Sequence, residues 1–326
     1  MRRAAVLIFA DGAACCALSK PEPAGSTRPP LRALATGLVD YAGLFPPAQL
    51  GMSDAMRNYA EYLRGTHSWI LGRFVVPIAR LGEFDAASAE LLSSGEGSIA
   101  WKLAALAGDD LAADVQAALK FNCRHWQGSE LGHAIIDTIE MRAQAGLDPE
   151  MARAAVPDFF TLYIETSSGR PAAIVDSAER SGARAKIRMG GVTGDAFPAP
   201  HEVIDFLAAC AARRLPFKAT AGLHHLIRSE YPLTYESGSK RAAMYGFLNV
   251  FIAAAALYAG ASRDNAHDIL MESDLNAFSL GDTGITWRGL VISTDDISGA
   301  REFAASFGSC SFREPVDEML AAGLIG

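Results

Sequence analysis

Residues 183–223, ARAKIRMGGVTGDAFPAPHEVIDFLAACAARRLPFKATAGL, hold two short strand-like runs on either side of an Ala-rich helical run. The pattern predicts strands over 183–188 and 216–221 and a helix over 200–213. Strands that alternate with helices in this way pair in parallel, with the helices packed on the sheet. This stretch therefore indicates an α/β fold built on a parallel sheet.

The same alternation extends from this stretch toward both ends of the chain. Further strands are predicted over 38–41, 70–76, 99–106, 134–140, 159–165 and 287–293. Helices are predicted over 52–63, 81–92, 110–121, 171–180, 241–258 and 316–324. Eight strand-then-helix units in about 295 residues fit a single-domain (β/α)8 barrel, the TIM barrel. An open doubly wound sheet is the alternative, but no G-x-G-x-x-G motif follows the first predicted strand.

The composition limits the classes of partner. Half of the 326 residues are apolar, one fifth are charged, and the net charge is −8 without a long basic run. This balance argues against nucleic acid as a partner and against an anionic membrane surface. The longest apolar run, 247–261, contains Asn249 and is shorter than the ~20 residues of a membrane span, so we expect a buried helix there.

Residues 1–31 differ in composition from the rest of the chain. Arg2 and Arg3 precede an apolar run that Asp11 interrupts, and four prolines follow. A secretory signal has an unbroken apolar core and a small-residue cleavage site. We therefore expect 1–31 to be a disordered extension, or the product of a translation start assigned too early, and 32–326 to form the barrel domain.

The five cysteines are scattered along the chain, and no C-x-x-C pair occurs. This pattern supports neither a disulfide framework nor a zinc knuckle. It predicts a reducing compartment, and hence a cytoplasmic protein.

Cations gather on the sixth and seventh predicted strands. Because side chains alternate between the two faces of a strand, Lys186 and Arg188 share one face and Lys218 lies on the matching face of the next strand. The apolar residues between them suit packing under helices, which directs the three cations into the barrel. Glu140 and Glu165 end neighbouring strands, so a structural network of ion pairs is the alternative to a functional site.

Two kinds of chemistry are open to such a cluster. A lysine beside other cations in a partly dry site loses its proton more readily, and the neutral amine can attack a carbonyl carbon. Arg188, together with Gly190, Gly191 and the start of the next helix, can hold a phosphate or carboxylate. Both indicate a small anionic substrate.

Residues 218–223, KATAGL, resemble the lysine-bearing strand of deoxyribose-phosphate aldolases and related class I aldolases, and the resemblance extends over about 40 residues, 186–225. It implies a barrel in which Lys186 forms a Schiff base and Lys218 lowers its pKa. Arg188 departs from the pattern, because those aldolases have a small hydroxyl residue there, and no clear proton-relay aspartate is found. Either lysine therefore stays open as the nucleophile, and so does the alternative that neither lysine acts as one. Segments 40–47 and 217–225 also resemble a bacterial barrel family that has no assigned activity.

Two histidines follow the seventh predicted strand. Adjacent residues of an extended chain point apart, so His224 and His225 are not a chelating pair, and one of them suits proton transfer or a substrate hydrogen bond. A metal site of one histidine with Glu140, Glu165 or Asp40 is the alternative. The following segment, 226–240, is longer than the 2–6 residues usual for such a loop and is predicted to be a lid or a surface loop.

These observations predict a cytoplasmic barrel enzyme, a lyase of class I aldolase type that acts on a small anionic carbonyl compound. The predicted catalytic residues are Lys186, Lys218, Glu165 and His224. The predicted substrate-binding residues are Arg188, Gly190, Gly191, Asp40, Glu140 and His225. The alternatives are a metal-dependent lyase or hydrolase and a barrel that binds a ligand without turnover. No metal or other cofactor is expected. The sequence leaves it open whether the protein forms a homo-oligomer.

Overall fold

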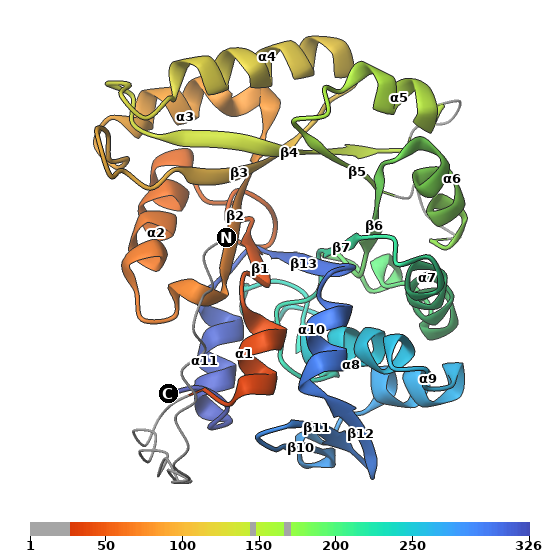
Figure 1. Ribbon diagram of the computed structural model, residues 1–326. Helices are drawn as coiled ribbons and strands as arrows, with labels where there is room; N and C mark the ends of the chain where they lie inside the picture. Colours follow the sequence, from red (N-terminus) through yellow and green to blue (C-terminus); the bar gives the residue numbers. More distant parts are fainter. Residues whose placement is uncertain (1–26, 144–147, 166–170) are drawn as a thin grey trace, which may run out of the picture.

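Eight parallel strands close into a barrel in the computed structural model, which describes residues 27–143, 148–165 and 171–326 (Figure 1). The barrel strands are β1 (Val39–Tyr41), β2 (Leu71–Pro77), β3 (Trp101–Leu106), β4 (Ala134–Arg142), β5 (Thr161–Glu165), β6 (Arg184–Arg188), β7 (Phe217–Thr220) and β13 (Ala304–Ser309). They lie around the barrel in chain order, and β13 pairs with both β7 and β1. The prediction of a (β/α)8 barrel is confirmed.

Helices cover the outside of the barrel (Figure 1). They are α1 (Pro29–Ala35), α2 (Met52–Arg64), α3 (Leu81–Ser88), α4 (Leu111–Arg124), α5 (Pro149–Ala155), α6 (Ala173–Ser181), α7 (Pro200–Arg213), α8 (Phe247–Tyr258), α9 (Arg263–Met271), α10 (Thr294–Ala300) and α11 (Arg313–Ala321). Short 3-10 turns lie at Ser68–Ile70, Ile78–Arg80, Gly194–Ala196 and Leu275–Ala277. Helix α2 is typical, because it buries Met52, Met56 and Tyr59 on one face at helical spacing.

Helix α8 is the buried helix expected in the long apolar run. Every residue from Phe247 to Ala256 is buried, and the helix packs against α7, α9 and α10. Its 12 residues are too few to span a bilayer. Across the described parts of the chain, no helix is both long and apolar enough to cross a membrane.

The prediction of the eighth barrel strand over 287–293 is wrong. That segment turns back at Arg288 and Gly289, between β11 (Gly284–Trp287) and β12 (Leu290–Ser293). These two strands form a small antiparallel sheet with β10 (Phe278–Leu280), outside the barrel. The real eighth strand reads AASFGS, and such small residues carry little β propensity, whereas WRGLVIS is rich in aromatic and branched residues.

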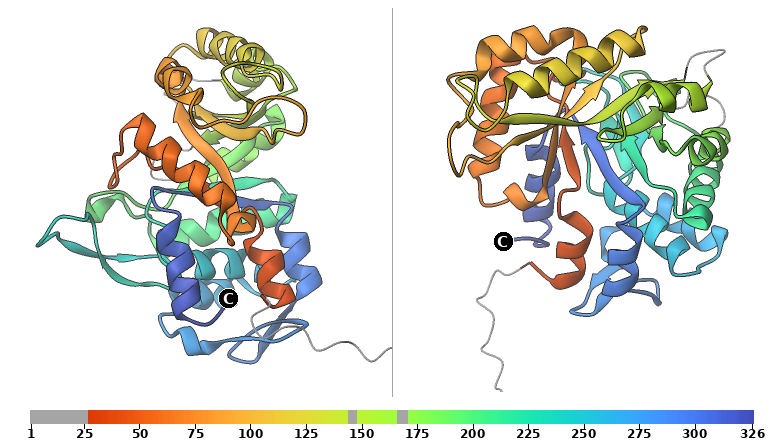
Figure 2. Two further views of the ribbon diagram at one scale, coloured as in Figure 1. Left: turned by 90° about the vertical axis from the view of Figure 1, so that its left-hand side faces the viewer. Right: turned by 45° about the horizontal axis from the view of Figure 1, so that its top comes forward.

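The predicted helix over 241–258 is also partly wrong. Its first residues form β9 (Arg241–Met244), which pairs with β8 (Ser229–Pro232) in an antiparallel hairpin. The hairpin extends away from the barrel (Figure 2). Helix α8 begins only after Gly246, where an added Cβ would lie 2.4 Å from the Ile227 Cα, so the chain turns where only glycine fits.

The predicted N-terminal extension falls largely outside the described residues, which begin at 27. Helix α1 begins at Pro29, where proline suits the first helical turn, and it packs against α10. Helix α1 therefore includes three residues, 29–31, that the sequence analysis placed in the extension.

Candidate active site

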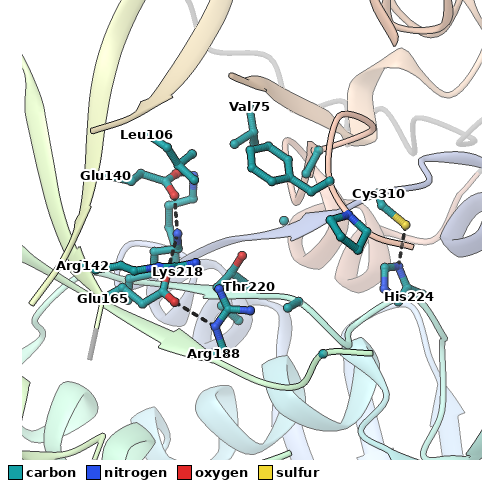
Figure 3. Close-up of a pocket in the computed structure, with 18 of the residues that line it drawn as sticks. Val75, Leu106, Glu140, Arg142, Glu165, Arg188, Lys218, Thr220, His224 and Cys310 are labelled. Carbon is teal, nitrogen blue, oxygen red and sulfur yellow. Dashed lines mark hydrogen bonds and ion pairs between the residues drawn. The ribbon is translucent and has the colours of Figure 1, made fainter. Parts of the chain in front are cut away.

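The carboxyl ends of the barrel strands enclose a cavity of about 280 Å³ (Figure 3). Its charged lining residues are Glu140, Arg142, Glu165, Lys186, Arg188 and Lys218. The volume lies just below the roughly 300–1,000 Å³ of pockets that hold drug-sized ligands, so the cavity suits a small molecule. This end of a barrel is where enzymes of this fold carry their active sites.

Strand alternation brings the two lysines together. Lys186 of β6 and Lys218 of β7 are direct partners in the parallel ladder. Their neighbours Ala185, Ile187 and Ala219 are fully buried in the apolar core. Since successive side chains point to opposite faces, both lysines point into the barrel, where each is only 3% exposed.

Glu140 bridges the two lysines. Its Oε2 lies 2.7 Å from the Nζ of Lys186, and its Oε1 accepts a hydrogen bond from the Nζ of Lys218. Both ammonium groups thus contact one carboxylate, and their charges lie close enough to interact strongly.

Each lysine has a second carboxylate partner, and these two partners lie in different surroundings. Lys218 Nζ lies 2.6 Å from Asp40 Oδ2, which also accepts a hydrogen bond from Ser306 Oγ at 2.8 Å. Lys186 Nζ lies 2.8 Å from Glu165 Oε2, whose other oxygen, Oε1, accepts from Arg188 Nε at 3.0 Å. Asp40 is fully buried and the Arg188 side chain is 41% exposed, so the network runs from the barrel interior to the mouth of the cavity.

The charges in this network hold each other ionised. Burial raises the pKa of Glu140, but the charges of Lys186 and Lys218 outweigh it and lower that pKa to about 2. Burial likewise raises the pKa of Glu165, and the charges of Lys186 and Arg188 bring it below its usual value. Burial lowers the pKa of Lys218, and Asp40 and Glu140 more than compensate, so that pKa is raised. At neutral pH both glutamates are therefore anions and Lys218 is an ammonium.

His224 lines the other side of the cavity from Glu140 and Glu165 (Figure 3). Its Nδ1 lies 3.1 Å from Ser309 Oγ and 3.7 Å from Cys310 Sγ. Burial, together with the charge of His225, lowers the pKa of His224 to about 4, so the imidazole is neutral at neutral pH. Burial also raises the pKa of the Cys310 thiol to about 11, which leaves it a poor nucleophile.

The remaining predicted binding residues divide into two groups. Gly191 lines the cavity, whereas an added Cβ on Gly190 would meet the Phe197 ring at 2.4 Å, so Gly190 permits close packing. His225 lies beside the cavity at the base of the hairpin: its Nδ1 is 2.6 Å from Glu318 Oε1, and its ring stacks on Tyr231 at 3.4 Å between centroids. The contacts of His225 are those of a residue that holds the hairpin in place.

The structure does not assemble the alternative metal site. His224 contacts Ser309 and Cys310, and His225 contacts Glu318, whereas Glu140 and Glu165 bind the lysines. Over the described ranges, no group of three or more histidine, cysteine, aspartate or glutamate side chains is arranged to hold a metal ion.

Several site residues were missed from the sequence. Ser306, Ser309 and Cys310 lie on or next to β13, whose position was assigned elsewhere. Tyr163 has its ring centroid 5.4 Å from Lys218 Nζ, close enough for a cation–π interaction. The run of small residues around Phe307 in 304–309 was the available signal, but it is weak because serine and glycine also dominate loops.

The lowered pKa values of His224 and Glu140 predict two separate steps of destabilisation as the pH falls. His224 takes up a proton near pH 6.5 in the unfolded chain but only near pH 4 in the folded protein. The unfolded state therefore binds more protons between these two pH values, and stability decreases as the pH falls from 6.5 to 4. Glu140 acts the same way between about 4.5 and 2. The free energy of unfolding attributable to His224 is expected to fall by about 2 kcal/mol from pH 7 to pH 5.

Denaturant unfolding of the wild type and His224→Gln at pH 7, 5 and 3 measures this. The variant should lose less stability than the wild type between pH 7 and pH 5. Below pH 4.5 it should still show the further loss of stability that comes from protonation of Glu140. Identical losses in both proteins down to pH 5 would contradict the assignment.

Fold and site together define a (β/α)8-barrel protein with a buried ionic network at the carboxyl ends of its strands. No protein-family model matches the chain, and the search of curated proteins found no match. Among solved structures, one similar to this chain is a deoxyribose phosphate aldolase from Aeropyrum pernix, described as having a unique tetrameric structure. The TM-score is 0.44 at 11% identity, over 90% of this chain and 98% of that chain.

Proposed function

We propose that the protein is a cytoplasmic lyase of class I aldolase type, which makes or breaks a carbon–carbon bond through a Schiff base on Lys186. The observation that carries the proposal is the pair of buried lysines, bridged by Glu140, in a cavity at the carboxyl ends of the strands. Each buried ion costs several kcal/mol of desolvation, so replacing a buried ion pair with apolar residues often leaves the stability of a protein unchanged or raises it. Such clusters in a cleft are typical of functional sites.

Lys186 is the better candidate for the nucleophile. Lys218 is held as an ammonium by Glu140 and by the fully buried Asp40, which raise its pKa. Lys186 instead pairs with Glu165, and Arg188 ties that carboxylate to the open side of the cavity. A substrate anion that enters at Arg188 brings its carbonyl group toward Lys186.

The first step is release of a proton from Lys186, and Glu165 is the acceptor at 2.8 Å. A substrate anion that binds Arg188 weakens the hold of this cation on Glu165 and so raises the proton affinity of the carboxylate. The neutral amine then adds to the carbonyl carbon, and one of its own protons moves to the carbonyl oxygen to form a hydroxyl group. Glu165 returns its proton to this hydroxyl group, and water leaves to give an iminium ion. The iminium nitrogen accepts the electron pair of the carbon–carbon bond that breaks.

Two further residues complete the proposed machinery. The ammonium of Lys218 holds Glu140 from the side opposite Lys186, which fixes this carboxylate between the two lysines. His224 is neutral and lines the cavity, so it is available to accept the hydroxyl proton of the fragment that leaves.

Reduction with borohydride tests the proposal. The protein is incubated with a panel of anionic aldehydes and keto acids, reduced, and weighed by mass spectrometry. A stable mass gain equal to the substrate less one oxygen atom is expected for the true substrate, and none for the denatured protein. No gain across a broad panel would refute the Schiff base.

Arg188→Met is expected to weaken substrate binding. Loss of a hydrogen bond to a charged group costs roughly 1.5–3 kcal/mol, so KM should rise about 10-fold to 100-fold. Steady-state kinetics measure the change, and Arg180→Met, an exposed arginine of α6, serves as the control. An unchanged KM would remove Arg188 from the anion site.

A barrel that binds an anion without turnover is the second candidate. The pairing of both lysine ammonium groups with carboxylates favours it, since a fully paired network also forms a stable binding site. It predicts tight anion binding with no borohydride adduct. A cytoplasmic location and a homo-oligomeric state stay predictions, and cell fractionation and light scattering test them.

A further inference from the structure

The cavity has two chemically different halves. All its charged side chains come from the neighbouring strands β4, β5, β6 and β7. The lining contributed by β2, β3 and the turn after β1 is apolar and consists of Ala42, Phe45, Pro46, Val75 and Leu106. Because β2 and β6 lie on opposite sides of the closed barrel, Val75 faces the cations of β6, whereas Leu106 lies beside Glu140 on the neighbouring strand.

The side chains confirm this division. Val75 of β2 lies across the cavity from Arg188 of β6 (Figure 3). Val75 is buried, and Phe45 and Leu106 are partly buried, so all three belong to the wall of the cavity rather than to an exposed fringe. Their side chains offer no hydrogen-bond donor or acceptor to a ligand.

From this division we infer that the substrate is an amphiphilic carbonyl compound, with an anionic group at Arg188 and an aliphatic or aromatic group against Phe45, Val75 and Leu106. The inference rests on the proposed function and deepens it. A hydroxylated substrate of sugar type would bury hydroxyl groups against the apolar half, where they lose their hydrogen bonds to water. The apolar half therefore selects against polyhydroxylated carbonyl compounds.

The size of the cavity agrees with a short substrate. About 280 Å³ accommodates a carboxylate, a carbonyl group and a chain of a few carbon atoms. A 2-oxo carboxylic acid with a branched or aromatic side chain has these parts in this order. Its carboxylate is adjacent to the carbonyl carbon, as Arg188 and Lys186 are adjacent on the inner face of β6.

Titration calorimetry on the whole protein tests the inference directly. The ligands are 4-methyl-2-oxopentanoate, a 2-oxo-3-deoxyhexonate with the same number of carbon atoms, and 2-deoxyribose 5-phosphate. We expect the branched acid to bind about 10-fold to 100-fold more tightly than either hydroxylated compound. Equal or tighter binding of a hydroxylated compound, or binding of none of the three, would overturn the inference.

Variants of the apolar half provide the second arm. Val75→Thr keeps the shape of the side chain and replaces a methyl group with a hydroxyl group. Leu106→Asn also places a polar group in the apolar half, at a less buried position, and serves if Val75→Thr misfolds. Both should reduce the preference for the branched acid at least threefold, whereas Val291→Thr, at an exposed site, should not. An unchanged preference in folded Val75→Thr and Leu106→Asn would overturn the inference.

The calorimetry separates this inference from the proposed function. If the branched acid binds tightly and no borohydride adduct forms, the Schiff base is refuted and the amphiphilic substrate class stands. If hydroxylated compounds form the adduct and bind more tightly, the Schiff base stands and the substrate class is refuted.

Discussion

Lys186→Arg is expected to lower kcat at least about 1,000-fold, because a guanidinium group stays protonated at any accessible pH and cannot act as the nucleophilic amine. The substitution keeps the positive charge that Glu140 and Glu165 bind, at 2.7 and 2.8 Å from Nζ in the wild type. Stability should therefore change little while turnover is lost. Steady-state kinetics and thermal unfolding of the same preparation measure both effects.

Lys218→Arg is the matched control, since it changes the neighbouring lysine in the same way. Lys218 acts through its charge in this account, so the arginine variant should retain more than a tenth of the wild-type kcat. If Lys186→Arg keeps a kcat comparable to that of the wild type, Lys186 is not the nucleophile. The same conclusion follows if only Lys218→Arg loses all activity.

Glu140→Gln is expected to have the largest effect on stability of any single change at the site. Glu140 is the only carboxylate shared by the two lysines in the contacts of the described residues, and it is buried with them. Removing one partner of a buried ion pair leaves charge uncompensated and typically costs about 3–5 kcal/mol. The loss should be greatest at neutral pH and smaller near pH 2, where the wild-type carboxyl group is itself partly protonated.

Denaturant unfolding measured by linear extrapolation tests this prediction. Glu90→Gln, at an exposed glutamate after α3, is the control and should change the free energy of unfolding by less than about 0.5 kcal/mol. A loss below about 1 kcal/mol for Glu140→Gln at neutral pH would contradict the bridging role, because typical hydrogen bonds alone contribute that much.

The inner faces of the central strands could be predicted from the sequence because strand alternation is a local property. Lys186 and Arg188 are separated by one apolar residue, and so the inward direction of both follows from spacing alone. The βα repeat likewise reveals itself through local periodicity, which is why seven of the eight barrel strands were found in the right order.

Contacts made by barrel closure could not be predicted in the same way. The pairing of Asp40 with Ser306 joins residues far apart in the chain, and it requires β13 to be recognised as the last strand. The small residues of β13 give no strong strand signal, whereas the outlying segment that ends in Leu290–Ser293 does.

The ionic network changes how the two lysines are understood. Spacing alone gives two cations side by side, and repulsion between them would free an amine. The structure inserts Glu140 between them and adds Asp40 and Glu165 as outer partners. In the proposed mechanism, the substrate anion produces the reactive state by shifting the proton of Lys186 to Glu165.

The position of the reduced adduct tests the central claim most directly. Wild-type protein, Lys186→Arg and Lys218→Arg are each treated with borohydride and the carbonyl compound that gives the largest mass gain, then digested and mapped by tandem mass spectrometry. The account predicts one modified residue, Lys186, in the wild type and in Lys218→Arg, and no adduct in Lys186→Arg. An adduct on Lys218, or on surface lysines alone, would contradict it.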